Sequence, residues 1–240
     1  MYAWRCSLVL ALAALGAQCQ SFETASIKPA DPAANGGSMS GTPGMMRMEN
    51  FSLKDWIQIA FGLKDFSLVA PAWLESAHFN VTAKGPSAST REETSAMLQN
   101  LLVERFKLAY HRESKVLPAY ALVLDKKGLK LTPSPEGEMS CSTNMGRVAR
   151  VTAKHATMAE LADLLSHQLD RPVKDLTGIT GAYDVKLEWT PDNSAAEREN
   201  PNAISIFSAL QDQAGLRLEA RKLPVDILVV DSIQRQPTDN

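Results

Sequence analysis

The chain has 240 residues, of which 45% are apolar and 22% are charged, so it can bury a sizeable core as one large domain or two small ones. Its formal net charge of -2 at pH 7 provides no cationic field for a phosphate backbone, and its lysine and arginine residues are scattered. We therefore expect no nucleic-acid partner.

The first predicted element is a signal peptide over residues 1–19. Arg5 precedes a short apolar run from Leu8 to Ala17, and a polar stretch follows. The run is shorter than the roughly 20 apolar residues that span a bilayer. We expect a secreted or periplasmic protein with no transmembrane span after signal cleavage. A lipid anchor on Cys19 is the less favoured alternative, because the bulky Gln18 stands where lipoprotein signals carry a small residue.

The cysteine count excludes a disulfide framework. Cys6 leaves with the signal peptide, so that Cys141 remains in a chain bound for an oxidising compartment, together with Cys19 if cleavage precedes it. Cys141 lies in the polar segment "EMSCSTNMG", with no histidine or lysine beside it to lower the pKa of its thiol. We expect this thiol to be a spectator.

Residues 20–125 are predicted to form a first α+β unit. It begins with a strand over 22–29 and a glycine- and proline-rich run over 31–44 that is typical of a flexible loop. Ser52 and Thr90 each precede an acid by three positions and begin helices with capping boxes. Strands follow each helix, and the unit is predicted to end in a hairpin over 107–125, with Pro118 at the start of its last strand.

The same order of elements recurs about 105 residues later. Thr157 and Ser205 are the predicted helix caps there, Gly215 is placed for a left-handed helix end, and a second hairpin is expected over 216–231. We therefore predict an α+β fold of two duplicated β-α-β-β-α-β-β units, with helices packed on mixed or antiparallel sheets. The remaining predicted segments are a linker and leading strand over 126–150, a second unit over 151–235 that contains a polar loop over 190–203, and a tail over 236–240.

Two histidines border the first helix of the second unit. His155 precedes it and His167 ends it, but twelve residues of helix turn the two rings onto different faces. In the first unit Asn50 and about Gly62 occupy the matching positions, so the fold requires neither histidine. We expect a solvated or helix-end role for both, and no metal site.

A second group of candidates lies on strands and turns. His111 and Glu113 are two residues apart on one strand face, where they could form a general base with its orienting partner or, with Arg112, a polar binding surface. A solvated cross-strand pair is the favoured alternative. Trp73 and Trp189 would anchor a partner if exposed, although burial is the more usual fate of tryptophan.

Three long phrases carry a family resemblance. "RFKLAYHRESKVLPAYALVLDKKGLKL", "LADLLSHQLDRPVKDLTGITGAYDVKLEWTPD" and "SIFSALQDQAGLRLEARKLPVDILVVDSI" resemble a large paralogous family of exported proteins of unknown function from acidobacteria and other soil bacteria. The resemblance runs from about Phe22 to Ile233. The second half is also similar to the short N-terminal domain of secretins and TonB-dependent receptors, which implies a module that binds proteins or docking peptides and does no chemistry.

The function that we predict is a non-catalytic binding or interaction module at the cell envelope, with an envelope protein or peptide as its partner and no cofactor. A hydrolase that uses His111 with Glu113, or Cys141, is the first alternative. A ligand-sensing domain is the second. The sequence leaves the oligomeric state open.

Overall fold

The computed structural model describes residues 21–31, 36–42, 44–87, 89–134, 137–191 and 203–238. The predicted signal peptide, Cys19 and most of the predicted polar loop 190–203 lie outside these residues. Contacts divide the chain into two compact units, each drawn from more than one stretch of sequence. Unit 1 comprises Met1–Leu63, Ala70–Ala109 and Asp231–Asn240, and unit 2 comprises Lys64–Val69 and Tyr110–Val230.

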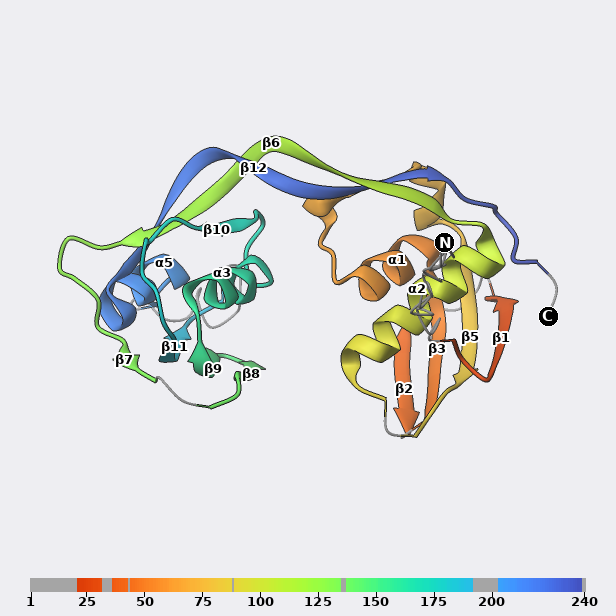
Figure 1. Ribbon diagram of the computed structural model, residues 1–240, viewed down its shortest axis with the longest axis horizontal. Coiled ribbons are helices and arrows are strands. Elements are labelled where there is room, and N and C mark those ends of the chain that lie inside the picture. Colours follow the sequence, from red (N-terminus) through yellow and green to blue (C-terminus); the bar gives the residue numbers. More distant parts are fainter. Residues whose placement is uncertain are drawn as a thin grey trace, which may run out of the picture. The chain divides into compact units, whose positions relative to one another are not determined.

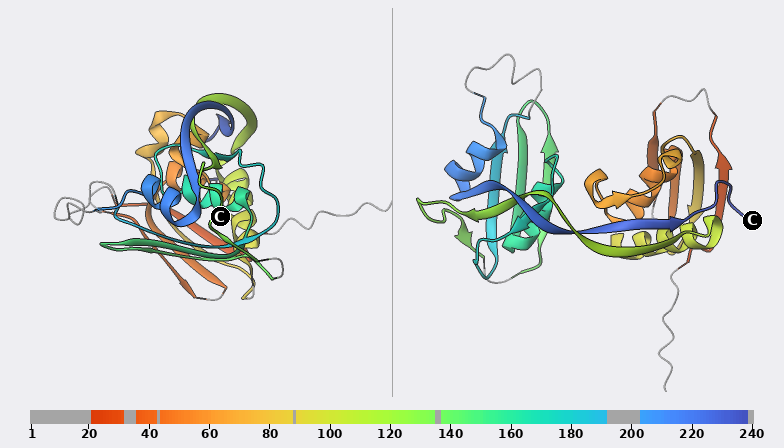
Figure 2. Two further views of the ribbon diagram at one scale, coloured as in Figure 1. Left: turned by 90° about the vertical axis from the view of Figure 1, so that its left-hand side faces the viewer. Right: turned by 90° about the horizontal axis from the view of Figure 1, so that it is seen from above.

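Unit 1 is built on an antiparallel sheet with the strand order β1-β5-β3-β2. Helices α1 (Leu53–Phe61) and α2 (Arg91–Phe106) lie on one face of this sheet (Figures 1 and 2). A one-turn helix, η2 (Ala72–Glu75), comes between α1 and β5. The strands are β1 (Thr24–Pro29), β2 (Ser38–Thr42), β3 (Met45–Ser52) and β5 (His78–Lys84).

Strand β2 corrects the expectation of a flexible loop over 31–44. The chain reverses at Gly44, which has a φ of 79°, and residues 38–42 pair with β3 in antiparallel register. Glycine and serine depress strand propensity, but the hydrogen bonds offered by β3 override that weak preference. The run therefore contains the edge strand of the sheet.

The core of unit 1 is formed by the alternating inward residues of the sheet and one stripe of each helix. The Phe106 ring meets Trp56 edge-on at 5.5 Å and Phe79 at 5.1 Å between ring centroids. Burial of each side chain of this size contributes about 1.5–3 kcal/mol. The buried residues include Met46, Met48, Leu53, Trp56, Ile57, Phe79, Val81, Ala83, Met97, Leu98, Leu101, Leu102 and Phe106.

The predicted helix starts are confirmed. Ser52, Thr90 and Thr157 each accept a hydrogen bond from the backbone N–H three residues on, and the side chain of the acid at that position accepts one from the backbone N–H of the cap. Ser205 caps α5 in the same way through the N–H of Ser208. Each cap satisfies an orphan donor of the first helical turn, and the sequence shows this pairing directly.

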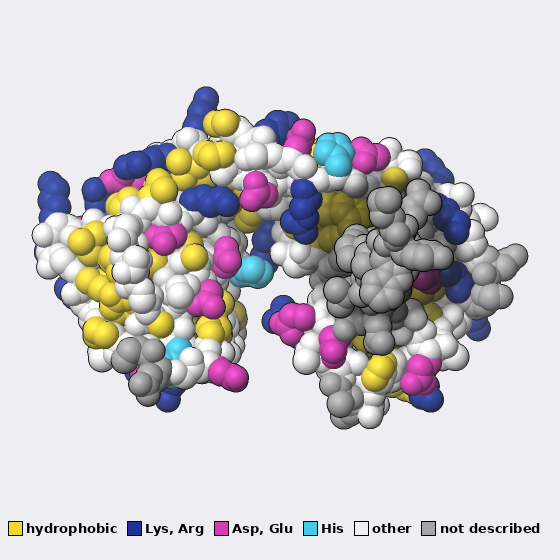
Figure 3. Space-filling model, viewed as in Figure 1, with side chains coloured by type: hydrophobic (Ala, Val, Ile, Leu, Met, Phe, Trp, Pro, Cys, Tyr) yellow, Lys and Arg dark blue, Asp and Glu magenta, His cyan; other side chains and the backbone are white. Residues whose placement is uncertain are grey.

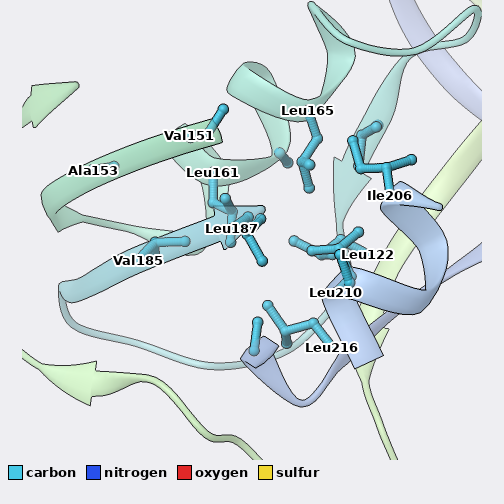
Figure 4. Close-up of a cluster of buried hydrophobic side chains, with 14 of the residues drawn as sticks. Leu122, Val151, Ala153, Leu161, Leu165, Val185, Leu187, Ile206, Leu210 and Leu216 are labelled. Carbon is cyan, nitrogen blue, oxygen red and sulfur yellow. The ribbon is translucent and has the colours of Figure 1, made fainter. Parts of the chain in front are cut away.

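Unit 2 contains a second antiparallel sheet, with the order β7-β11-β9-β8. Its helices are α3 (Met158–Ser166) and α5 (Ile206–Ala209), and α5 continues into the π-helical turn η3 (Leu210–Ala214). Figure 4 shows side chains of the sheet, of both helices and of Leu122 meeting in one apolar cluster. The strands are β7 (Thr132–Pro133), β8 (Ser140–Met145), β9 (Ala149–Ala156) and β11 (Tyr183–Trp189).

A further sheet in unit 2 has the order β10-β6-β12-β4. Strand β10 runs parallel to β6, and β4 runs parallel to β12. The one-turn helix η1 (Asp65–Ser67) leads into β4. The strands are β4 (Leu68–Val69), β6 (Ala109–Leu124), β10 (Val173–Asp175) and β12 (Leu216–Ser232).

The two predicted hairpins are wrong, because β6 and β12 are each one long strand. Polar residues in the middle of each segment suggested a turn. In β6 these residues belong to a stretch, 109–116, in which every side chain is exposed. Pro118 and Pro224 lie within the strands and do not end them.

The predicted α+β class, with mixed and antiparallel sheets, is confirmed. The order β2-β3-α1-β4-β5-α2-β6 recurs as β8-β9-α3-β10-β11-α5-β12. Common descent of the two halves stays a prediction.

Candidate functional site

The predicted polar group lies on the exposed part of β6. His111, Arg112 and Glu113 are consecutive on this strand, and all three side chains are exposed. Their surroundings are solvated, as expected for the cross-strand pair that we favoured over a general base. A binding role for them stays a prediction. On the face of the molecule shown in Figure 3, cationic and anionic side chains are interspersed.

The two tryptophans have different surroundings. Trp189 ends β11 inside the core of unit 2 and is 5% exposed, so in this structure it offers no surface to a partner. Trp73 lies in η2, half-buried, and the guanidinium carbon of Arg235 lies 4.8 Å from its ring centroid. Its ring therefore already has a cationic neighbour from its own chain.

Cys141 is a free, exposed thiol on β8. Its Sγ lies 4.0 Å from the hydroxyl of Thr143. His111 is on β6, in the other sheet of unit 2. A hydrolase that uses Cys141 stays an untested alternative.

His167 ends α3, as expected. Its N–H bonds the carbonyls of Asp163 and Leu164, and its Nδ1 lies 2.8 Å from the Asp163 oxygen. Among the described residues, no group of three or more His, Cys, Asp or Glu side chains is arranged to hold a metal ion.

The structure brings together Ser134, His155 and Asp184, a cluster that sequence reasoning missed. His155 Nδ1 lies 2.8 Å from the Ser134 hydroxyl and 3.3 Å from the Ser134 carbonyl oxygen. The Asp184 carboxylate accepts hydrogen bonds from the Ser134 hydroxyl and from the His155 backbone N–H, and both lower the pKa of Asp184. A serine, a histidine and an aspartate in contact suggest nucleophilic catalysis.

The contacts differ from those of a catalytic triad. The Ser134 carbonyl can only accept, so the ring donates to it when the proton is assigned to Nδ1, while the Ser134 hydroxyl donates to Asp184. A catalytic histidine would instead accept the serine proton, and its carboxylate partner would orient the ring. Here Asp184 contacts the main chain of His155.

Unit 1 contains the same backbone arrangement and a matching set of hydrogen bonds, without catalytic side chains. Asn50 and His155 have φ angles of 55° and 54°, and each occupies a shift in strand register that is typical of a β-bulge. The Asn50 N–H bonds the Asn80 side chain at 2.8 Å, and its Nδ2 donates to the Gly36 carbonyl at 2.9 Å. Asn80 and Gly36 thus do for Asn50 what Asp184 and Ser134 do for His155. The cluster serves the fold.

The candidate site is a groove of about 500 Å³ in unit 1, which we call the β2 groove. It is formed by β2, the start of β3, the loop after β5 and the first turns of α2. None of its lining residues is charged: Phe22, Met39, Ser40, Gly41, Thr42, Gly44, Met45, Met46, Ala83, Gly85, Pro86, Ser87, Ser89, Thr94 and Met97.

The strand register explains why the groove opens on the helix side of the sheet. Met39 pairs with Met48 and Gly41 pairs with Met46, and both partners on β3 are buried beneath the helices. Paired residues share a face, so Met39 and Gly41 also face the helix side. Met39 is nevertheless 53% exposed, whereas Met46 is 8% exposed. The floor of the groove is the part of this face that the core leaves open.

Methionines give the groove its character. Four of the nine methionines of the chain lie between residues 39 and 48. Three of these, Met39, Met45 and Met46, line the groove, and Met97 joins them from α2. Methionine is flexible and polarisable, which suits adaptable apolar recognition. This clustering is the sequence signal that could have located the groove, although the fold was needed to bring Phe22, Gly85 and Met97 to it.

Within the part of the chain that the structure describes, no helix is both long and apolar enough to cross a membrane. A family model described as "Protein of unknown function (DUF3738)" matches residues 54–233. No curated protein and no solved structure matches the chain.

Proposed function

The chain belongs to the DUF3738 family of proteins of unknown function, and we propose that it is an exported, non-catalytic binding module of the cell envelope whose partner occupies the β2 groove. The similarity of its second half to the short N-terminal domain of secretins and TonB-dependent receptors, whose modules bind proteins, agrees with this proposal.

Export rests on the N-terminal sequence. A single arginine followed by ten mostly apolar residues, Leu8 to Ala17, is typical of a secretory signal peptide. Expression of the full chain followed by cell fractionation tests it. A shortened protein outside the inner membrane, with a new N-terminus near residue 20, is the expected outcome, and an unprocessed cytoplasmic protein contradicts it.

The β2 groove is the observation that carries the binding role. Ligand pockets are mostly apolar concavities of roughly 300–1,000 Å³, and the groove has that size and an uncharged, methionine-rich lining. The polar clusters do not compete with it. His111, Arg112 and Glu113 lie on open strand surface, and Ser134, His155 and Asp184 have a counterpart in unit 1 that cannot perform acid–base chemistry.

Site-specific photo-crosslinking in the producing cell tests the binding role. Benzoylphenylalanine in place of Met39 puts the probe in the groove, and the same probe in place of Arg47 puts it on the opposite face of the same sheet. Both positions are exposed, so neither replacement disturbs the core. We expect a discrete adduct from position 39 and none from position 47. Equal labelling at both positions, or none at position 39, would contradict a partner in the groove.

A further inference from the structure

We propose that the occupant of the β2 groove is an extended, uncharged polypeptide segment of another protein, which pairs its main chain with the free edge of β2 and places an apolar side chain among the groove methionines. This inference rests on the proposed function and names the chemistry of the partner.

The edge of β2 supplies the main-chain half of the recognition. In the order β1-β5-β3-β2, this strand has a neighbour on one side only among the residues that the structure describes. An edge strand presents a row of N–H and C=O groups, and an added strand is the ligand that matches their alternation. All five residues of β2 are exposed, so the edge is accessible along its length.

The two edges of the sheet differ in how they are protected. Strand β1, at the far edge, carries Lys28 and Pro29, two residue types that prevent unwanted strand pairing. Strand β2 reads Ser-Met-Ser-Gly-Thr and contains neither a charge nor a proline. One edge of the sheet therefore carries residues that disfavour strand pairing, and the other edge does not. The groove lies at the edge without them.

The lining of the groove defines the side chains of the partner. Successive residues of a paired strand point to opposite faces, so every second side chain of the added segment would lie on the helix side, where the groove opens. A charged side chain there would lose its hydration without a compensating ion, because none of the lining residues is charged. The lining thus favours uncharged, apolar residues at alternate positions.

A displayed library of random heptapeptides, selected on the full chain, tests this inference. We expect the enriched peptides to share apolar residues at positions i and i+2 and to lack proline between them, since proline removes the N–H that strand pairing needs. For each enriched peptide, replacement of one groove-facing apolar residue by glutamate is expected to weaken binding at least about tenfold, as is proline at the intervening position. Binding would be followed by fluorescence anisotropy.

The protein offers a matched pair of variants. Met39→Glu introduces a charge on the helix side of edge strand β2, and Met145→Glu does the same on edge strand β8 of unit 2. The two methionines are 53% and 57% exposed, so both variants are expected to unfold at wild-type denaturant concentrations. Met39→Glu should weaken binding at least about tenfold, while Met145→Glu should leave it within about twofold.

The outcomes separate this inference from the proposed function. Suppose that position 39 gives a crosslink, but the enriched peptides are charged, rich in proline or insensitive to Met39→Glu. The binding role would then stand, and the proposal of an added strand would be overturned. Concentration-dependent dimers that Met39→Glu abolishes would identify a second copy as the occupant and also overturn it. Tight binding of detergent or lipid that competes with the crosslink would also overturn the strand partner, because an acyl chain needs no strand edge.

Discussion

At the scale of single residues, the most informative positions are Asn50 and His155. Both adopt a left-handed backbone conformation, and both have their N–H held by an Asn or Asp side chain on the neighbouring strand. The alignment of the two halves predicted that these residues occupy matching positions, but it did not predict their shared backbone conformation. A positive φ depends on strand register, and residue type alone does not reveal register.

His155→Asn is therefore expected to preserve the fold. Asparagine tolerates the left-handed region better than most residues, and its amide can donate to the Ser134 carbonyl as Asn50 donates to Gly36. The free energy of unfolding should change by less than about 0.5 kcal/mol, whereas His155→Val, a β-branched residue at positive φ, should lose about 1–3 kcal/mol. Urea unfolding measures both. A large loss in the asparagine variant would show that the imidazole does something that the matching position does not need.

Asp184 gives a prediction for pH. Hydrogen bonds from the Ser134 hydroxyl and the His155 N–H lower the pKa of its carboxyl group in the folded protein. Its contribution to stability is therefore present above the ordinary aspartate pKa of about 4 and is lost as the pH falls through the lower folded value.

Asp184→Asn should make stability less dependent on pH in the acid range, with little change at pH 7, because Asn80 already fills the matching position. Thermal midpoints from about pH 6 down to about pH 2 compare the variant with the wild type. Two curves of identical slope would show that this carboxylate contributes nothing to the acid dependence.

At the scale of elements, helices were the most predictable part of the fold. A capping box is local, so the starts of α1, α2 and α3 could be read within four residues. Strands were harder, because β2 depends on a neighbour that the sequence does not identify, and the polar stretch of β6 looks like a turn when its partner β12 is unknown. The β2 groove was missed for the same reason: its walls come from distant segments.

The helix ends provide a second prediction from matched positions. Lys107 ends α2 at a φ of 52°, and Gly215 ends η3 at a φ of 69°. Lys107→Gly should stabilise the protein by about 1 kcal/mol, because glycine adopts this conformation without the Cβ contact.

Gly215→Ala should have the opposite effect, and a larger one. A Cβ at Gly215 would clash with the Gly128 carbonyl oxygen, a backbone atom that cannot turn away. Chemical denaturation of both variants gives the comparison. Equal effects in the two variants would refute the assigned geometry of these helix ends.

At the scale of the whole molecule, the sheet β10-β6-β12-β4 alternates between the two halves of the sequence. Strands β4 and β6 come from the first half, β10 and β12 come from the second, and every hydrogen-bonded neighbour in this sheet joins one half to the other. The sequence predicted two units in succession along the chain. It could not show this exchange, since periodicity identifies a strand but not its partner.

A nick between the halves tests the alternation. A protease site inserted between the exposed residues Lys126 and Lys127 should allow cleavage of the folded protein without loss of the sheet, because three ladders still join the fragments. We expect the two fragments to elute together in size-exclusion chromatography and to separate only in denaturant. Independent elution under native conditions would contradict the strand order.

The position of β12 in that sheet also bears on when the protein can mature. This strand is the last one that the structure describes, yet it lies between β6 and β4. Until the ribosome has delivered residues 216–232, both neighbours lack their shared partner, and the sheet cannot close. If the chain is exported as we propose, it would stay open while it passes N-terminus first through a translocation pore, and this sheet would close only after residues 216–232 have emerged on the far side.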